Sequence, residues 1–389
     1  MCRNIKAGIH TFSLYYKLSY TEAQNLIETL TELESCYPVT ADKWSYDGIY
    51  KSAHCADLGV KIYIYRCYSH SGFTLRITPC SLLKGGYAAE NLYQPTDADN
   101  WRLTNILDSI LVELDLESDS GEPIEVDNMS LCRADPCINF YLDSDDEVLE
   151  YLRILKKSAL ILHYSVDGFK QISSRVKNIE EANKHSYRIK GKKAQFTAYD
   201  KTYELHHNPY CPEDPEEMYI FRIEAELKRD ALLKRLNKNE RSSEEKILEA
   251  TARDAVKILT KFLKKMQIGT GNHIRYCDAE TAIKNSKLGA KMRDRMLYLI
   301  RKVSDSNLSS ALEKLCKKHD LNNNQCERIL DQFDALGISP ITLRNDSKFS
   351  SLPSLISLLQ EDQQSIPKRD EEGFIILEWK DTMPKKRHS

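Results

Sequence analysis

Three segments in the middle of the chain alternate between apolar and polar side chains, and this alternation constrains the fold more than any other feature. The segments are residues 131–142, 195–203 and 220–228. Successive side chains of a β-strand point to opposite faces of its sheet. Each segment is therefore predicted to form a strand with one apolar and one polar face. The apolar face of the third segment is formed by Phe221, Ile223, Ala225 and Leu227.

The polar faces of these predicted strands carry the side chains that can perform chemistry. They hold Arg133 and Asp135 on the first strand, Tyr199, Lys201 and Tyr203 on the second, and Arg222, Glu224 and Glu226 on the third. If the strands pair in one antiparallel sheet, these rows meet. A half-exposed sheet whose charges simply face water would show the same alternation. Pro136 indicates an edge or a bulge in the first strand.

A meeting of these rows would assemble a site for phosphate chemistry. Asp135, Glu224 and Glu226 would offer hard oxygen ligands, which suit Mg²⁺ or Mn²⁺. Tyr199 would lie beside the ion as a nucleophile. Cations on the same rows would stabilise a pentacovalent phosphate and lower the pKa of the tyrosine. These cations are Lys201, Arg133 and Arg222.

The remaining sequence predicts an α+β architecture followed by helices. We expect strands at residues 9–16, 60–68 and 73–78, the last two as a hairpin, and helices at residues 21–34, capped by Thr21, and 101–116. Later helices are expected at residues 243–266, 279–285, 291–303, 308–319 and 325–336. We therefore predict an antiparallel sheet with helices on one face over residues 1–230, an all-helical domain over residues 231–360, and a disordered tail over residues 361–389.

Composition limits the location and the partners. The 389 residues carry a formal net charge of -2, so a basic surface must be local, and residues 228–265 hold twelve Lys or Arg against six Asp or Glu. The eleven cysteines are scattered, which favours reduced thiols over a disulfide framework. The sequence shows neither a long apolar stretch nor a secretory signal, so we expect a cytoplasmic protein without membrane association.

Three short motifs in the same region resemble those of a known family. Arg133–Asn139 is similar to an Arg-x-Asp-x-x-x-Asp/Asn strand, Tyr199–Glu204 to a Tyr-Asp-Lys-x-x-Glu segment, and Phe221–Leu227 to an Arg-Phe-Glu-x-x-Leu strand. Rolling-circle replication initiators carry these motifs in this order. The chain most resembles the filamentous-phage replication proteins and the staphylococcal-type plasmid initiators, over about residues 130–235.

The resemblance implies an enzyme that starts plasmid or phage DNA replication. Such a protein nicks one strand at the origin through a phosphotyrosine intermediate and rejoins it, using Mg²⁺ or Mn²⁺. The resemblance implies single-stranded or supercoiled origin DNA and a host helicase as partners, and it makes Asp135 and Glu224 acidic metal or structural residues of the catalytic sheet. The oligomeric state stays open.

The nucleophilic tyrosine also stays open among three residues. Tyr199 and Tyr203 form a Tyr-x-x-x-Tyr pair, a spacing that some initiators use to pass a DNA strand between two tyrosines. Tyr187 resembles a tyrosine that precedes a glycine in the plasmid initiators, but alternation places it on the apolar side of its strand. We expect Tyr199 first, Tyr187 second and Tyr203 third.

The chain departs from those nickases that bind metal with a His-hydrophobic-His strand, because its sequence contains no such strand. His10 and His185 stand alone in the sequence, and such histidines are expected at the surface or as core residues with satisfied hydrogen bonds. The metal site is therefore predicted to be built from carboxylates.

The helical half offers a second contact with DNA. Residues 308–340 are predicted to form a helix-turn-helix that ends at Gly337. Glu327 and Asp331 make the second helix acidic, which argues against its insertion into a major groove. Three functions remain open at this level: a nicking enzyme, a DNA-binding replication or regulatory protein that does not cut, and a structural protein that does not bind DNA.

Overall fold

The structure of the 389-residue chain is a computed structural model. It describes residues 4–33, 35–41, 48–86, 88, 91–115, 123–168, 179–207, 218–362, 368–369 and 375–378. Most of the predicted tail, residues 361–389, lies outside these described residues. Within it, Ile375–Glu378 forms a short strand that pairs with the first strand of the chain.

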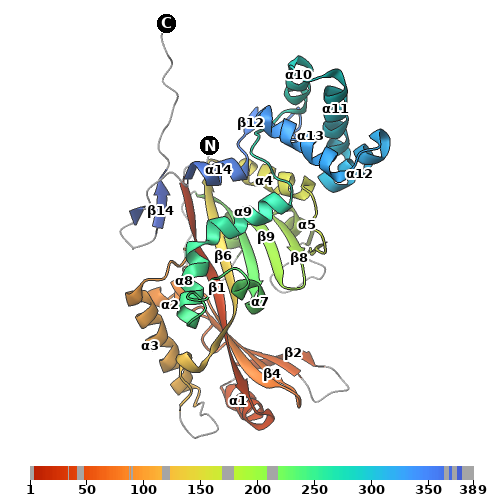
Figure 1. The fold of residues 1–389 in the computed structure, drawn as a ribbon. Helices are drawn as coiled ribbons and strands as arrows, with labels where there is room; N and C mark the ends of the chain where they lie inside the picture. The colour runs from red at the N-terminus through yellow and green to blue at the C-terminus, as the bar shows by residue number, and fades with distance from the viewer. Residues whose placement is uncertain are drawn as a thin grey trace.

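A large antiparallel sheet organises the described part of the chain (Figure 1). Its strands are adjacent in the order β2, β3, β4, β5, β1, β6, β10, β9, β8 and β7, and β14 pairs with the start of β1. The bounds are β1 (Asn4–Leu18), β2 (Cys36–Ala41), β3 (Gly48–Ser52), β4 (Val60–Arg66), β5 (Ser71–Ile77), β6 (Ser130–Leu142), β7 (Ser165–Val166), β8 (Ser186–Lys190), β9 (Ala194–Asp200), β10 (Tyr219–Lys228), β13 (Lys368–Arg369) and β14 (Ile375–Glu378).

The three alternating segments form neighbouring strands of this sheet, so the condition for their polar rows to meet is fulfilled. Strand β10 lies between β6 and β9 and pairs antiparallel with both. The register sets Arg222 opposite Tyr199 on one side and Glu224 opposite Cys137 on the other. Because paired residues project from the same face of a sheet, the polar rows come together. The face of β6, β10 and β9 that carries Arg222 and Glu224 is called the polar face below.

The second segment is shorter than predicted. Strand β9 ends at Asp200, and residues Lys201–His206 form a helix, α6. The Asp200 carboxylate accepts a hydrogen bond from the backbone N–H of Tyr203 at 2.8 Å and so begins this helix. The prediction that Lys201 and Tyr203 continue the strand and share a face with Tyr199 is therefore wrong.

Helices pack on the apolar face of the three strands. In α4 (Asp145–Lys157), the Tyr151 ring stacks on Phe221 with centroids 5.7 Å apart. In α9 (Ala255–Lys265), the Phe262 ring stacks on Phe196 with centroids 5.8 Å apart. All four rings are buried, and burial of each contributes roughly 1.5–3 kcal/mol.

The helices predicted at residues 21–34 and 101–116 are present, and the structure adds several helices that the sequence did not predict. Helix α1 (Tyr20–Glu32) is capped by Ser19 in a capping box with Glu22, not by Thr21. The helix predicted at residues 243–266 is interrupted at Asp254 into α8 (Glu244–Arg253) and α9. The remaining elements are α2 (Pro79–Lys84), α3 (Asp97–Glu113), η1 (Val126–Asn128), α5 (Ile179–Lys184) and α7 (Arg229–Leu233).

The last helices lie together beside one end of the sheet (Figure 1). They are α10 (Tyr276–Asn285), α11 (Ala290–Asp305), α12 (Leu308–His319), α13 (Asn323–Ala335) and, next to α9, α14 (Leu355–Asp362), with β11 (His273–Ile274) pairing with β12 (Ser351–Leu352). Gly337 follows α13 with φ +69°, in the left-handed region that glycine adopts freely, so the predicted stop is confirmed.

An α+β fold built on an antiparallel sheet is thus confirmed. The placement of helices on one face only, and the division near residue 230, stay predictions; α8 and α9, which follow that boundary, contact β1 and β6. Cys316 on α12 and Cys326 on α13 bring their side chains into contact. No helix among the described residues combines the length and apolar character needed to cross a membrane.

The buried His273 is expected to make the helical part sensitive to acid. Its Nδ1 lies 2.7 Å from the Ile341 carbonyl oxygen, and burial lowers the pKa of His273 to about 4. An unfolded histidine titrates near 6.5, so between these pH values the unfolded chain binds the extra proton and stability falls as pH falls. The loss of unfolding free energy should reach roughly 3 kcal/mol.

In His273→Asn, the side-chain amide can donate to the Ile341 carbonyl but does not titrate. Urea unfolding at pH 7 and pH 4 should show a smaller acid loss for this variant than for the wild type, whereas parallel pH profiles would contradict the assignment.

Candidate functional site

The polar face is buried where the three motif strands meet. Arg222 and Asn139 are fully buried, Asp135 is 1% exposed, and Lys201, which enters from α6, is 1% exposed. The alternative in which these charges simply face water therefore does not hold. Ionic groups at such depth require partners, because an isolated charge pays a large desolvation penalty.

Arg133 joins two of the predicted acidic residues. Its Nε and Nη2 donate to the two Asp135 oxygens at 2.8 and 2.7 Å, and its Nη1 lies 3.0 Å from Glu226 Oε2. The Thr11 hydroxyl also donates to Asp135, and Arg76 Nη2 lies 4.0 Å from the same carboxylate. A two-bond guanidinium–carboxylate contact is strong and orients both groups. Arg133 therefore compensates both Asp135 and Glu226.

Glu224 is held by a histidine and a tyrosine. His10 Nδ1 lies 3.1 Å from Glu224 Oε2, and the Tyr199 hydroxyl donates to the same oxygen at 3.3 Å. Burial, together with Arg222, lowers the pKa of His10, so its imidazole is neutral near pH 7 and donates from Nδ1. Burial alone would raise the pKa of Glu224, but the hydrogen bond from His10 and the charges of Arg222 and Arg133 outweigh it and lower that pKa. Glu224 is therefore ionised.

Tyr199 lies between this carboxylate and the buried cations. Burial of its phenol, followed by the negative charge of Glu224, raises the pKa of Tyr199 well above its usual value, while Arg222 acts in the opposite direction. Arg222 Nε donates to Asn139 Oδ1 at 2.6 Å. Burial lowers the pKa of Lys201, which forms an ion pair with Glu204. The phenol is thus protonated at rest and donates to an ionised carboxylate.

A basic groove lies at the other end of the polar face. It has a volume of about 660 Å³, and strands β1, β4, β5, β6 and β10 contribute to its walls. Arg133 and Glu226 belong both to this groove and to the buried network. The cations and aromatic residues of its lining are Arg76, Arg133, Lys192, Lys193, Lys228, Arg229, Tyr63 and Tyr65. Cations interleaved with aromatic rings form the type of surface that binds single-stranded nucleic acid.

Two of the three candidate tyrosines lie elsewhere. Tyr187 pairs with Ala198 on the apolar face and is 7% exposed, and burial raises its pKa to about 12. Tyr203 is on α6, where its ring stacks on His185 at 3.9 Å and on His207 at 4.0 Å. The structure therefore places Tyr199 with Arg133, Asp135, Lys201, Arg222, Glu224 and Glu226, and places Tyr187 and Tyr203 apart from them.

Several residues of this site were not found from the sequence. His10 and Thr11 reach the polar face where the register of β1 with β6 shifts between Ile9 and Phe12. No local pattern marks such an irregularity, so His10 was treated as an isolated histidine. Tyr63 and Tyr65 share one face of β4, and this alternation was available in the sequence, but nothing there tied β4 to the motif strands.

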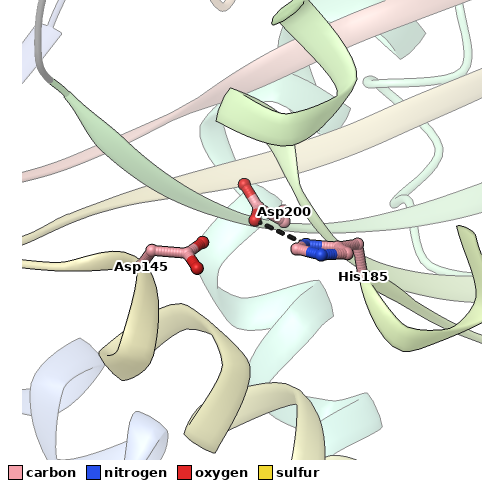
Figure 2. Close-up of side chains that lie close together, drawn as sticks. All are labelled: Asp145, His185 and Asp200. Carbon is pink, nitrogen blue, oxygen red and sulfur yellow. Dashed lines mark hydrogen bonds and ion pairs between the residues drawn. The ribbon is translucent and has the colours of Figure 1, made fainter. Parts of the chain in front are cut away.

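The three predicted metal ligands do not form a set of free carboxylates in this arrangement. Both Asp135 oxygens accept from Arg133, Glu226 also contacts Arg133, and Glu224 contacts His10. Among the described residues, a group that brings three ligand atoms within 4.8 Å of one another is Asp145, His185 and Asp200 (Figure 2). Sequence reasoning missed this group, because its members come from three separate elements.

Removal of Arg133 should destabilise the fold strongly. In Arg133→Met the buried Asp135 carboxylate loses its main counter-charge, which should lower the free energy of unfolding by roughly 3–5 kcal/mol. The matched control is Arg229→Met. Arg229 pairs with Glu244 at 2.7 Å but is 38% exposed, so its loss should lower stability by at most about 1 kcal/mol. Urea unfolding at pH 7 measures both, and equal losses would show that Asp135 does not depend on Arg133.

Comparison with known proteins gives similarity to solved structures alone. No protein-family model matches the chain, and no curated protein matches it. Among solved structures, the chain is similar to a rolling circle replication initiator protein from Geobacillus stearothermophilus, at 10% identity and a TM-score of 0.30. The match covers 67% of this chain and 85% of that protein. A TM-score of this size does not establish a common fold, so the function has to be inferred from the chain's own residues.

Proposed function

We propose that the chain is a rolling-circle replication initiator that nicks and rejoins one DNA strand through Tyr199. One observation carries the proposal: the segments that resemble initiator motifs lie on the adjacent strands β6 and β10 and at the end of β9, where the Tyr199 hydroxyl donates to Glu224 and Tyr199 is opposite Arg222. The basic, tyrosine-lined groove that begins at Arg133 and Glu226 supports DNA as the substrate.

The groove holds the strand that is to be cut. Lys192, Lys228 and Arg229 contact its phosphates, and bases stack on Tyr63 and Tyr65. Alternate residues of β10 project from the polar face. Lys228 lies at the groove, Glu226 and Glu224 follow it, and Arg222 comes next, opposite Tyr199. A strand that follows this row brings a phosphate to the phenol.

The chemical step is a transesterification. The Tyr199 oxygen attacks phosphorus, the P–O3′ bond breaks, and a 5′-phosphotyrosyl link forms while the 3′ oxygen leaves. The phenolic proton moves to Glu224 along the hydrogen bond that this carboxylate already receives, and it is then passed to the leaving 3′ oxygen, which becomes a 3′-hydroxyl. The cations Arg222 and Lys201 stabilise the charge of the pentacovalent phosphate. Attack of a 3′-hydroxyl on the phosphotyrosine reverses these steps and rejoins the strand.

No step is assigned to a metal ion at Asp135, Glu224 and Glu226. A divalent ion there would have to displace Arg133 from two carboxylates, and the guanidinium already supplies the positive charge. Asp135 and Glu226 instead hold Arg133 at the junction of groove and buried site.

A second candidate function is DNA binding without cutting. It is favoured by the raised pKa of Tyr199, which keeps the phenol protonated, and by the pairing of every predicted acidic ligand with Arg133 or His10. DNA binding in the groove does not require Tyr199, which is not among the residues that line it. Binding and cleavage can therefore be separated by experiment.

Substitution of the proposed nucleophile should abolish cleavage. Incubated with supercoiled origin plasmid and Mn²⁺, the wild type should give open circles with covalently attached protein, visible as an SDS-resistant adduct. Tyr199→Phe should lower adduct formation at least about a thousandfold, since no other group replaces the attacking oxygen. The matched controls Tyr187→Phe and Tyr203→Phe should retain the adduct.

Loss of the adduct in a control variant but not in Tyr199→Phe would contradict the assignment of Tyr199 as the nucleophile. DNA binding without any adduct in the wild type would favour the second candidate function.

Substitutions in the groove should weaken DNA binding in two distinguishable ways. Lys192→Gln with Lys228→Gln removes two phosphate contacts, so the slope of log Kd against log salt should fall by about 1.4 for single-stranded DNA. Tyr63→Leu with Tyr65→Leu removes the stacking surfaces. DNA binding should then weaken by roughly 1–3 kcal/mol per stacked base, while the slope of log Kd against log salt stays unchanged. The control pair Lys284→Gln and Lys287→Gln, exposed near α10, should change neither. Fluorescence anisotropy with a labelled oligonucleotide measures both quantities, and equal effects of the lysine and control pairs would place the DNA elsewhere.

A further inference from the structure

A second cluster of ionisable groups lies where α4, β8 and β9 approach one another. Asp145 is the first residue of α4, His185 directly precedes β8, and Asp200 is the last residue of β9. Figure 2 shows both carboxyl groups turned toward the imidazole. His185 Nδ1 lies 2.9 Å from Asp200 Oδ2, and the three side chains bring ligand atoms within 4.8 Å of one another.

The charge of this cluster is not balanced in the way that it is at the polar face. Among the described residues, no lysine or arginine forms an ion pair with Asp145 or Asp200, whereas Arg133 pairs with both Asp135 and Glu226. Asp145 and Asp200 also bring carboxylate oxygens within 4.8 Å of each other. Two negative charges this close favour a proton or a cation between them.

The histidine is oriented as a metal ligand would be. Its Nε2 lies 3.2 Å from Glu181 Oε1, so Nε2 can donate a hydrogen bond to this carboxylate while Nδ1, which faces Asp200, coordinates an ion once its own proton has left. Metal-binding histidines usually donate their second nitrogen to a carboxylate or carbonyl in this way. The Tyr203 ring stacks on the imidazole at 3.9 Å and 10°, which fixes the plane of the ring.

We propose that Asp145, His185 and Asp200 bind one divalent transition-metal ion. Two carboxylates and one imidazole suit Mn²⁺ or Zn²⁺ better than Ca²⁺ or Mg²⁺, because the imidazole nitrogen is a softer ligand than oxygen. The ion takes the place of the proton between His185 and Asp200, and that proton leaves to solvent. Glu181 orients the imidazole without contacting the ion.

An ion bound by this cluster would affect the polar face through the backbone that joins Tyr199, Asp200 and Lys201. Asp200 lies between Tyr199 and Lys201 in the sequence, and its second oxygen begins α6 by accepting from Tyr203 N–H. An ion at Asp200 fixes the turn from β9 into α6 and so positions the two residues on either side of it. Asp145, His185 and Asp200 are positioning residues in this sense. The ion site does not depend on the proposed nicking.

Mn²⁺ binding to the full chain, measured by electron paramagnetic resonance after removal of bound metal with EDTA, tests the proposal without DNA. The wild type should bind one Mn²⁺ per chain and lower the signal of free Mn²⁺ accordingly. Asp145→Asn and His185→Gln should each weaken binding at least tenfold, and Glu181→Gln should weaken it about 10–100-fold without changing the stoichiometry. The matched control Glu226→Gln alters a carboxylate of the polar face and should bind as the wild type does.

Asp145 is exposed at a helix start, so Asp145→Asn should fold normally, and circular dichroism of each variant confirms this. Zn²⁺ retained in place of Mn²⁺, found by elemental analysis and lost in Asp145→Asn, would also support the site. A wild type that binds neither ion would overturn it. Unchanged binding in both Asp145→Asn and His185→Gln, or loss in Glu226→Gln alone, would overturn it too. None of these results depends on whether Tyr199 cuts DNA.

Discussion

The antiparallel pairing of β10 with both β6 and β9 is the constraint on which the candidate site depends. Its register sets Arg222 opposite Tyr199 and Lys228 opposite Arg133, and so joins residues that are far apart in the sequence. A slip of one residue in β10 would turn Arg222 and Glu224 into the apolar layer under α4 and α9. The buried rings of Phe196 and Phe221 therefore fix the chemistry of the opposite face, since they allow only one register.

Charge balance divides the ionisable residues into two groups with different roles. On the polar face, Arg133 balances the charges of Asp135 and Glu226, and the neutral His10 donates a hydrogen bond to Glu224, which leaves a protonated phenol whose acceptor is already in place. At the junction of α4 and β9, two carboxyl groups face one imidazole without a basic partner among the described residues. The first group is suited to bind and process an anionic phosphodiester, and the second to hold a cation. Asp200 links them, because it follows Tyr199 directly.

Periodicity in the sequence was sufficient to predict strands at β6, β9 and β10 and several of the helices, but not that these strands are neighbours in one sheet. It failed at Asp200, where the strand pattern continues through Tyr203 but a side-chain cap starts a helix instead. It also missed His10 and His185, which enter their sites through an irregular register in β1 and through the packing of α4 near β8. Such contacts depend on tertiary structure, so a single isolated histidine gives no local signal of them.

The identity of the DNA-linked tyrosine tests the central claim most directly. Trypsin cuts after Lys193 and Lys201, so the peptide of residues 194–201 contains Tyr199 and neither of the other candidates. After reaction with supercoiled origin plasmid, digestion with nuclease and trypsin, and mass spectrometry, the account predicts a nucleotide attached to this peptide. A nucleotide on the peptide with Tyr187 or on the peptide with Tyr203, and none on residues 194–201, would contradict it.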